Sequence, residues 1–403
     1  MSLLRAPGLG ALLAAQVVSA LGSQMTFLAL PWFVLATTGS PTKMSIVLAV
    51  ELAPVAILGI PSGAVIARWG ARRSMLVSDL VRAPLIASIP LLHELGWLSF
   101  PLLLVLVSLV GVFMAPYFAS QALILPELVG HDERVVAQAT ALVEGARRAT
   151  SLLGPAAAGL LIAMFSAPVV LYVDAATFLL SFALLLLFVP HRPPLPQSDE
   201  GKGLLAGIRF VLRDRMLRVL CFTALLTNGF GQMLAAGLTV LAYEEYSSSR
   251  VAGAFFAAFG AGAVLGSLVA VRLVGRYDPL RLGATAFVAL TLPVFALAVE
   301  LPVPAIVVAL ALSSFFGPLV NAPLIGVITM RTPEVVRAKV MTAVITLAVL
   351  AGPAGMLIAG PFLETWGARP IFLLVAVGQL LAVIPFAVVA FGSREAASAP
   401  AAS

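Results

Sequence analysis

The chain has 403 residues, of which 61% are hydrophobic and only 10% are charged. Soluble domains carry about 25% charged residues, and a chain this apolar could not cover a water-facing surface with polar side chains. The composition therefore excludes a cytosolic enzyme and a disordered chain. Cys221 is the only cysteine, which excludes a disulfide-stapled secreted domain.

Long apolar stretches follow one another along the whole chain. A helix needs about 20 mostly apolar residues to cross a bilayer, and twelve such stretches are centred near residues 22, 54, 83, 112, 152, 180, 229, 260, 290, 315, 348 and 380. The first, from Gly8 to about Ala36, is too long for a signal peptide. Runs such as Phe178–Val189 do not alternate in polarity as the strands of a membrane barrel do. We predict an all-α membrane protein with twelve transmembrane helices.

The basic side chains are distributed unevenly over the predicted loops. With twelve spans, loops on the side of the termini carry eighteen Lys and Arg residues, and loops on the opposite side carry three. Lys and Arg accumulate in cytoplasmic loops. We therefore expect a multi-pass protein of the cell (inner) membrane with both termini in the cytoplasm. The positive charge is explained by topology, so nucleic acid is not expected as a partner.

The sequence divides into two halves at its longest polar stretch, Pro190–Arg218. We expect a six-helix bundle over 1–190, a cytoplasmic linker with an amphipathic helix over 191–218, and a second bundle over 219–403. The halves echo each other, because Gly154-Pro155 in the fifth span corresponds to Gly352-Pro353 in the eleventh. Such internal repeats place a substrate site near the midplane between the halves and suggest alternating access.

The loop between spans 2 and 3 carries a motif of glycines and arginines. It reads Gly63-Ala-Val-Ile-Ala67-Arg68-Trp-Gly70-Ala-Arg72-Arg73. This resembles the signature of the major facilitator superfamily. At the position of Ala67, that family usually has an aspartate, which helps to lock the cytoplasmic gate. The resemblance implies that Gly63 permits close helix approach and that Gly70 permits a tight turn. Asp79, with Arg82 beside it in span 3, is the candidate for the missing lock.

The resemblance covers essentially the whole chain. Gly154-Pro155 resembles the Gly-Pro motif of proton-coupled drug exporters, and parts of spans 1 and 3 look like the branch that holds macrolide and enterobactin exporters. The resemblance implies the major facilitator fold, two pseudo-symmetric six-helix bundles around a cavity. It also implies secondary active export of an amphipathic or hydrophobic drug-like compound by proton antiport. A siderophore or lysophospholipid exporter remains the alternative within this class.

Ionisable residues inside spans are costly and are functional candidates by default. Asp79 and Arg82 are three residues apart and can neutralise each other, as Glu144 can with Arg147 and Arg148. Each of these two groups of residues could form a structural ion pair or could take part in coupling transport to protons. Asp174 is expected at the outer start of span 6, where a carboxylate favours a helix N-terminus.

Glu51 differs from these residues. It lies about ten residues into span 2, without a basic residue three or four positions away. Apolar surroundings favour the protonated form of a carboxyl group. We therefore expect Glu51 to carry the coupling proton, with Asp79 and Glu144 as the next candidates. Contact with a cationic substrate and pairing with an arginine of another helix are the alternatives.

Neutral polar and aromatic side chains recur at helical spacing in spans 1, 4, 7 and 10. They fit a substrate cavity, although such stripes also act as contacts between helices. The candidates are Gln16, Gln24, Phe113, Tyr117, Gln121, Asn228, Gln232, Phe315, Phe316 and Asn321.

Enzymatic chemistry finds little support in the sequence. The three histidines are far apart, no metal-binding pattern is present, and no phosphate-binding loop motif occurs. A polytopic lipid enzyme and a non-transporting sensor remain the alternatives from other classes. We expect no catalytic residue, no metal and no cofactor. The expected partners are a small-molecule substrate, protons and the lipid bilayer, with the chain as a monomer.

Overall fold

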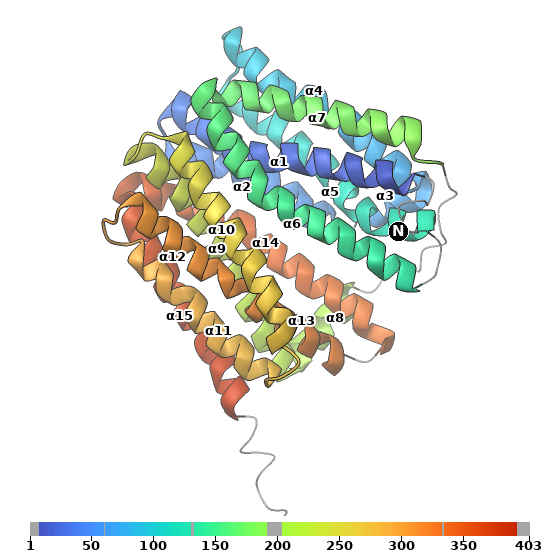
Figure 1. Ribbon diagram of the computed structural model, residues 1–403, viewed down its shortest axis with the longest axis vertical. Coiled ribbons are helices and arrows are strands. Elements are labelled where there is room, and N and C mark those ends of the chain that lie inside the picture. The colour runs from blue at the N-terminus through green and yellow to red at the C-terminus, as the bar shows by residue number, and fades with distance from the viewer. Residues whose placement is uncertain (1–7, 60, 130–132, 192–203, 333, 393–403) are drawn as a thin grey trace, which may run out of the picture. The chain divides into compact units, whose positions relative to one another are not determined.

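The computed structural model describes residues 8–59, 61–129, 133–191, 204–332 and 334–392. Within these ranges the chain forms helices and no strand (Figure 1). The helices are, in chain order, α1 (Leu9–Thr38), α2 (Pro41–Leu58), α3 (Ser62–Trp69), α4 (Ala71–Glu94), α5 (Phe100–Val129), α6 (Glu133–Met164), α7 (Ala167–Phe188), α8 (Leu204–Arg213), α9 (Arg215–Glu244), α10 (Ser249–Leu273), α11 (Pro279–Ala296), α12 (Val303–Phe315), α13 (Gly317–Arg331), α14 (Glu334–Trp366) and α15 (Ala368–Gly392).

Membrane-length helices account for most of the described chain. Eleven segments are long and apolar enough to cross a bilayer, with α12 and α13 together forming one of them. They coincide with eleven of the twelve predicted spans. The remaining predicted span lies in α6, which has 32 residues but carries Glu144, Arg147 and Arg148 in its first half. The predicted all-α membrane fold is confirmed.

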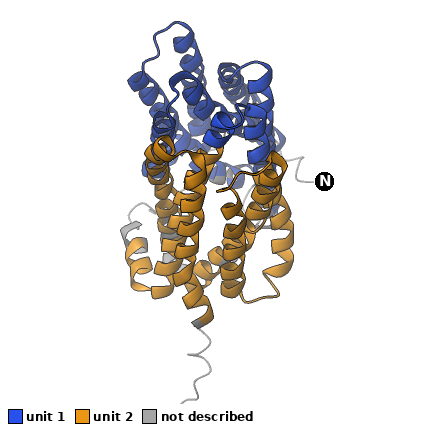
Figure 2. Cartoon of the chain, turned by 90° about the vertical axis from the view of Figure 1, so that its left-hand side faces the viewer, with its two compact units in different colours: residues 1–201, 239–257 blue, residues 202–238, 258–403 orange. Residues whose placement is uncertain are grey.

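The helices form two compact units, coloured separately in Figure 2. The first unit comprises residues 1–201 and 239–257, and the second comprises 202–238 and 258–403. In the first unit, α1 packs along α6 and α7, while α5 packs against α2 and α4. In the second unit, α11 packs against α12, α13 and α15.

Helix lengths repeat between the two halves of the sequence. Helices α1 and α9 each have 30 residues, and α6 and α14 have 32 and 33. Pro155 lies inside α6 and Pro353 inside α14, each preceded by a glycine. The structure thus shows the internal correspondence that the Gly-Pro pairs indicated.

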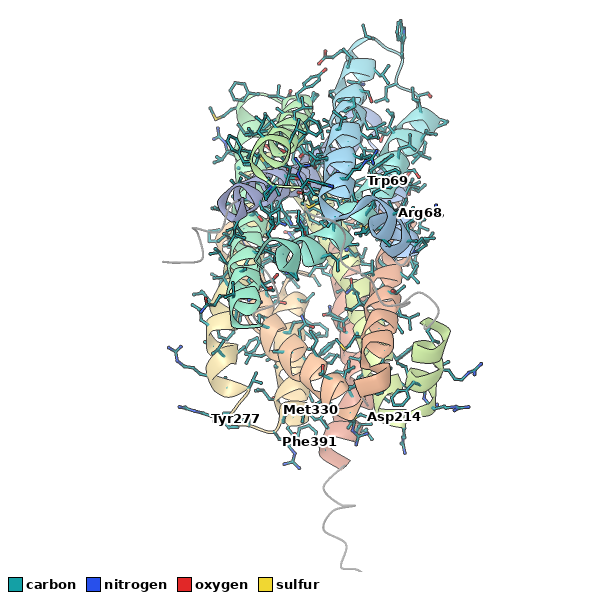
Figure 3. The ribbon with its side chains drawn as sticks, turned by 90° about the vertical axis from the view of Figure 1, so that its right-hand side faces the viewer. Arg68, Trp69, Asp214, Tyr277, Met330 and Phe391 are labelled. Carbon is teal, nitrogen blue, oxygen red and sulfur yellow. The ribbon has the colours of Figure 1, made fainter. Side chains whose placement is uncertain are left out.

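The predicted amphipathic helix of the linker is present as α8, whereas residues 192–203 lie outside the described part of the chain. Val211 on this helix is 2% exposed and belongs to the core of the second unit, while the adjacent Leu212 is exposed. Because α8 packs against α14, one of its faces is buried by protein. Figure 3 shows Asp214, at the end of α8, near the same end of the second unit as Tyr277, Met330 and Phe391.

Within the first unit, α6 and the start of α10 cross at two glycines. A side chain added at Gly159 would come within 2.6 Å of the Ser249 carbonyl oxygen and 2.9 Å of the Gly253 Cα atom. The Ser249 hydroxyl donates a hydrogen bond of 3.1 Å to the Gly159 carbonyl. The two backbones therefore touch directly, which only residues without a side chain permit.

Candidate functional site

The arginine-bearing motif occupies α3 and the turn into α4. Gly70 has φ +79°, a conformation that disfavours other residues, so the predicted tight turn is confirmed. Arg72 donates hydrogen bonds of 3.2 and 2.9 Å to the carbonyl oxygens of Leu185 and Leu186. These carbonyls lie in the last turn of α7, where a cation is favourable because of the helix dipole. Arg72 thus fastens the loop to the C-terminal end of α7.

The other arginines of the motif lie on the surface with Trp69, whereas Ile66 and Ala71 are buried. Arg68 and Trp69 are exposed at the end of α3 (Figure 3), and the Arg73 guanidinium lies 5.8 Å from the centre of the Trp69 ring. A side chain added at Gly63 would meet no atom within 4 Å. The expected close helix approach at Gly63 is therefore wrong for this structure. The sequence pattern could not show this, because it contains no information about which helix faces α3.

Asp79 and Arg82 form a fully buried ion pair on α4. Their nearest atoms, Arg82 Nη2 and Asp79 Oδ1, are 2.6 Å apart, and the side chains are 1% and 0% exposed. The Ser181 hydroxyl on α7 donates a 2.6 Å hydrogen bond to the second oxygen of Asp79. The predicted neutralisation within α4 is confirmed. Because these partners belong to the first unit, the Asp79 carboxylate is already occupied there.

Aromatic rings enclose the Arg82 guanidinium. Its central carbon lies 4.4 Å from the centre of the Tyr117 ring on α5 and 4.2 Å from that of Phe178 on α7. A guanidinium over an aromatic face is stabilised electrostatically, and more strongly where water is absent. Arg82 therefore joins α4, α5 and α7 through one buried charge.

Asp174 is a buried carboxylate that the sequence placed incorrectly. It is the eighth residue of α7 and 1% exposed, so the expected position at a helix N-terminus is wrong. Its carboxylate accepts hydrogen bonds from Thr26 on α1, at 2.6 Å, and from Thr177, at 3.2 Å. A side chain at Gly22 would collide with the Asp174 carboxylate. The sequence signal for this carboxylate was an acidic residue in an apolar span, whereas its contact with Gly22 could be found only in the structure.

Glu51 lies in the middle of α2, half-buried. Its backbone carbonyl packs against Gly111 of α5, where an added side chain would collide with it. Among the described residues, its carboxylate makes no hydrogen bond or ion pair. The structure therefore places an unpaired carboxyl in the middle of a membrane-length helix.

Glu144 behaves differently from Glu51. It forms an ion pair of 2.6 Å with Arg147 and one of 3.4 Å with Arg148, and all three side chains are at least 40% exposed. The predicted ion pair on α6 is confirmed.

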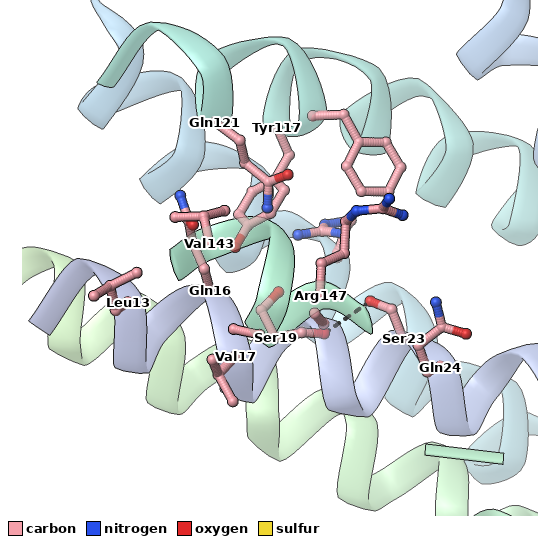
Figure 4. A pocket seen from close by; sticks show the side chains of 14 residues that line it. Leu13, Gln16, Val17, Ser19, Ser23, Gln24, Tyr117, Gln121, Val143 and Arg147 are labelled. Carbon is pink, nitrogen blue, oxygen red and sulfur yellow. Dashed lines mark hydrogen bonds between the residues drawn. The ribbon is translucent and has the colours of Figure 1, made fainter. Parts of the chain in front are cut away.

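A pocket opens inside the first unit between α1, α4, α5 and α6 (Figure 4). It encloses about 700 Å³ of empty space, part of which is continuous with the outside. Four of the predicted cavity residues line it, namely Gln16, Gln24, Tyr117 and Gln121, whereas Phe113 does not. Gly154 of α6 lies against Gln24, so the Gly-Pro segment sets the spacing between α6 and this part of α1.

The predicted cavity residues of the second unit are arranged differently. Gln232 on α9 lies against α14. A Cβ atom added at Gly352 of α14 would lie 3.5 Å from the Cγ atom of Gln232. The rings of Phe315 and Phe316 pack edge to face at the break between α12 and α13. Asn228 and Asn321 are exposed. The structure does not bring these five residues together in one described pocket of that unit.

Membrane-length helices around a polar pocket define the class of protein. The pocket opens among apolar spans and presents amide, hydroxyl and guanidinium groups. Such an arrangement, in which pocket-lining polar groups lie within transmembrane helices, is typical of transporters.

The chain belongs to the Major Facilitator Superfamily, whose family model matches residues 12–246 and 221–403. It is 28% identical over 382 residues to the multidrug efflux pump Tap of Mycolicibacterium fortuitum, covering 92% of each chain. It is 26% identical over 378 residues to the multidrug efflux pump Tap of Mycobacterium tuberculosis (strain ATCC 25618 / H37Rv), covering 91% of this chain and 89% of the relative. The predicted family is confirmed, and the chain is a transporter rather than an enzyme.

The fold is also found in solved structures. The nucleoside transporter NupG superposes with a TM-score of 0.79 at 13% identity, covering 94% of this chain and 98% of NupG. A bacterial homologue of the lysosomal transporter Spinster, in its inward-facing and occupied form, gives 0.76 at 14% identity and covers 96% of each chain. At these identities the likeness establishes the major facilitator fold.

Proposed function

We propose that this chain exports amphipathic or hydrophobic drug-like compounds in exchange for protons, by alternating access. Two relatives named multidrug efflux pumps, which match about nine tenths of the chain, support the export of drugs. The charge asymmetry of the loops supports a position in the cell membrane with both termini in the cytoplasm. In this proposal the transporter acts as a monomer.

The observation that carries the proton coupling is the unpaired carboxyl of Glu51 inside a membrane span. Asp79 and Glu144 are held by arginines, whereas Glu51 has no ion-pair partner among the described residues. A carboxyl group in apolar surroundings favours its neutral form, and it ionises when water reaches it. Glu51 therefore takes up a proton when one face of the membrane is accessible and releases it when the other is.

The experiment is transport in proteoliposomes with an imposed pH gradient. A panel of cationic, anionic and uncharged drug-like compounds is screened first, and the compound transported fastest is used with the variants. Glu51→Gln keeps the shape of the side chain but cannot titrate. We expect it to slow pH-driven accumulation at least tenfold while retaining substrate binding and gradient-independent exchange. Glu300→Gln, in the exposed loop before α12, is the matched control and should behave like the unmodified protein.

Two outcomes would contradict the proposal. If the Glu51→Gln protein still concentrates substrate against its gradient, the coupling proton is carried elsewhere. If it loses substrate binding together with transport, Glu51 contacts the substrate instead.

A further inference from the structure

The pocket of the first unit contains buried polar atoms without a partner. The Gln16 side chain is 5% exposed, and neither its Nε2 nor its Oε1 atom has a hydrogen-bond partner among the described residues. Tyr117 is 2% exposed, and its hydroxyl group also has no hydrogen-bond partner among the described residues. In Figure 4, Gln16 points from α1 toward Gln121, which extends from α5 on the opposite side of the pocket. A buried polar group without a partner is costly, so this site favours an occupant that forms hydrogen bonds.

The hydrogen-bonding character of the pocket wall is mixed. An amide such as that of Gln16 offers two N–H donors and one carbonyl acceptor. Gln24 and Gln121 add two further amides to the lining. An occupant that only accepts hydrogen bonds, or only donates them, leaves half of the Gln16 amide unpaired.

The described residues that line the pocket carry charges of one sign. They include Arg82 and Arg147 but no carboxylate. The acids that neutralise these arginines, Asp79 and Glu144, are already bound to them at 2.6 Å. A cation in the pocket would therefore meet guanidinium groups and no available negative charge, which is unfavourable where water is scarce.

The remaining wall is apolar and suits the body of an amphipathic molecule. Leu13, Val17, Phe118 and Val143 line it beside the amides.

We infer that this pocket binds small amphipathic molecules that carry no net positive charge and both donate and accept hydrogen bonds, with aromatic amides as the defining class. Gln16 is the central contact of this site. The inference rests on the proposed function, because it makes the pocket a part of the substrate path.

The test measures binding to the purified full-length protein by calorimetry, without a membrane or a gradient. Chloramphenicol, phenacetin and N-acetyltryptophanamide serve as uncharged aromatic amides, and tetraphenylphosphonium serves as a lipophilic cation of similar apolar character. We expect at least one amide to bind at least tenfold more tightly than tetraphenylphosphonium. Gln16→Leu should weaken the binding of that amide at least tenfold and raise or preserve the melting temperature, because it removes an unpaired buried amide.

Two further variants separate this role from a structural one. Gln379→Leu is the matched control, because Gln379 on α15 is 3% exposed with an unpartnered Oε1 but lies outside this pocket; its amide binding should not change. Gln16→Glu, nearly the same size, adds the negative charge that the lining lacks. It should weaken amide binding and strengthen tetraphenylphosphonium binding at least tenfold.

Three results would overturn the inference: tetraphenylphosphonium binding as tightly as the best amide, no amide binding at all, or unchanged amide binding by Gln16→Leu. These outcomes are distinct from a failure of the proposed function. If the amides bind as expected but no pH-driven transport is found, proton-coupled export is wrong and the pocket chemistry stands. If pH-driven transport is found while the binding pattern fails, only the substrate class is wrong.

Discussion

The buried ion pair of α4 allows a prediction with a magnitude. Replacing Asp79 by asparagine keeps the volume of the side chain but leaves the Arg82 guanidinium without its counter-ion. Both side chains are at most 1% exposed, so water cannot take the place of the lost carboxylate. Removing one partner of a buried pair typically costs about 3–5 kcal/mol. At about 2–4 °C per kcal/mol for a unit of roughly 200 residues, we expect the melting temperature of Asp79→Asn to fall by about 6–20 °C.

The protein contains its own control for this prediction. Glu144 pairs with Arg147 at the same distance of 2.6 Å and the same helical spacing, but the side chains are 40% and 60% exposed. Exposed pairs contribute about 0–1 kcal/mol, so Glu144→Gln should lower the melting temperature by no more than about 4 °C. The assay is the fraction of monodisperse protein that survives heating in detergent, measured for both variants under identical conditions.

A double variant tests the cause of the destabilisation. In Asp79→Asn combined with Arg82→Met, no charge is left unpaired and the apolar contact with Tyr117 and Phe178 is largely retained. We expect this protein to be more stable than Asp79→Asn alone, because a buried pair can often be exchanged for apolar side chains at little cost. The reasoning is refuted if Asp79→Asn is no less stable than Glu144→Gln, or if the double variant is the least stable of all.

Two other predictions follow from the helix crossing and from the loop charges. Gly253→Leu should abolish transport or prevent folding, because an added side chain would collide with the backbone of α6 near Gly159. A normal yield with normal transport would show that this helix crossing is dispensable. Reporter fusions should place Lys43 and Arg250 outside the cell and Lys202 in the cytoplasm, and any reversed position would contradict the twelve-span topology.

Much of the fold could be predicted from the sequence because the bilayer restricts it strongly. Backbone groups in lipid must be hydrogen-bonded within the protein, and an apolar run of about 20 residues achieves this as a helix. Interactions between side chains close together in the sequence could also be predicted. The spacing of three residues between Asp79 and Arg82 puts both side chains on one face of α4, and the glycine at position 70 indicated a tight turn.

The tertiary structure decided the features that depend on which helices face each other. The sequence favoured a helix N-terminus for Asp174, whereas packing of α1 against α7 brought it to Thr26, 148 residues away. Gly63 was expected to sit in a close helix contact and has open space instead, while Gly22 and Gly111 are among the glycines that provide close approaches in the first unit.

The pocket shows the same division between sequence and structure. Periodicity identified Gln16, Tyr117 and Gln121 as polar positions on apolar helices, but it could not separate a contact between helices from a lining residue. Hydropathy depends only on the identity of neighbouring residues in the chain, whereas the pairing of a polar group depends on atoms from other helices. The amino-acid sequence therefore determined that these side chains lie in the membrane, and only helix packing determined that no described residue pairs with the Gln16 amide.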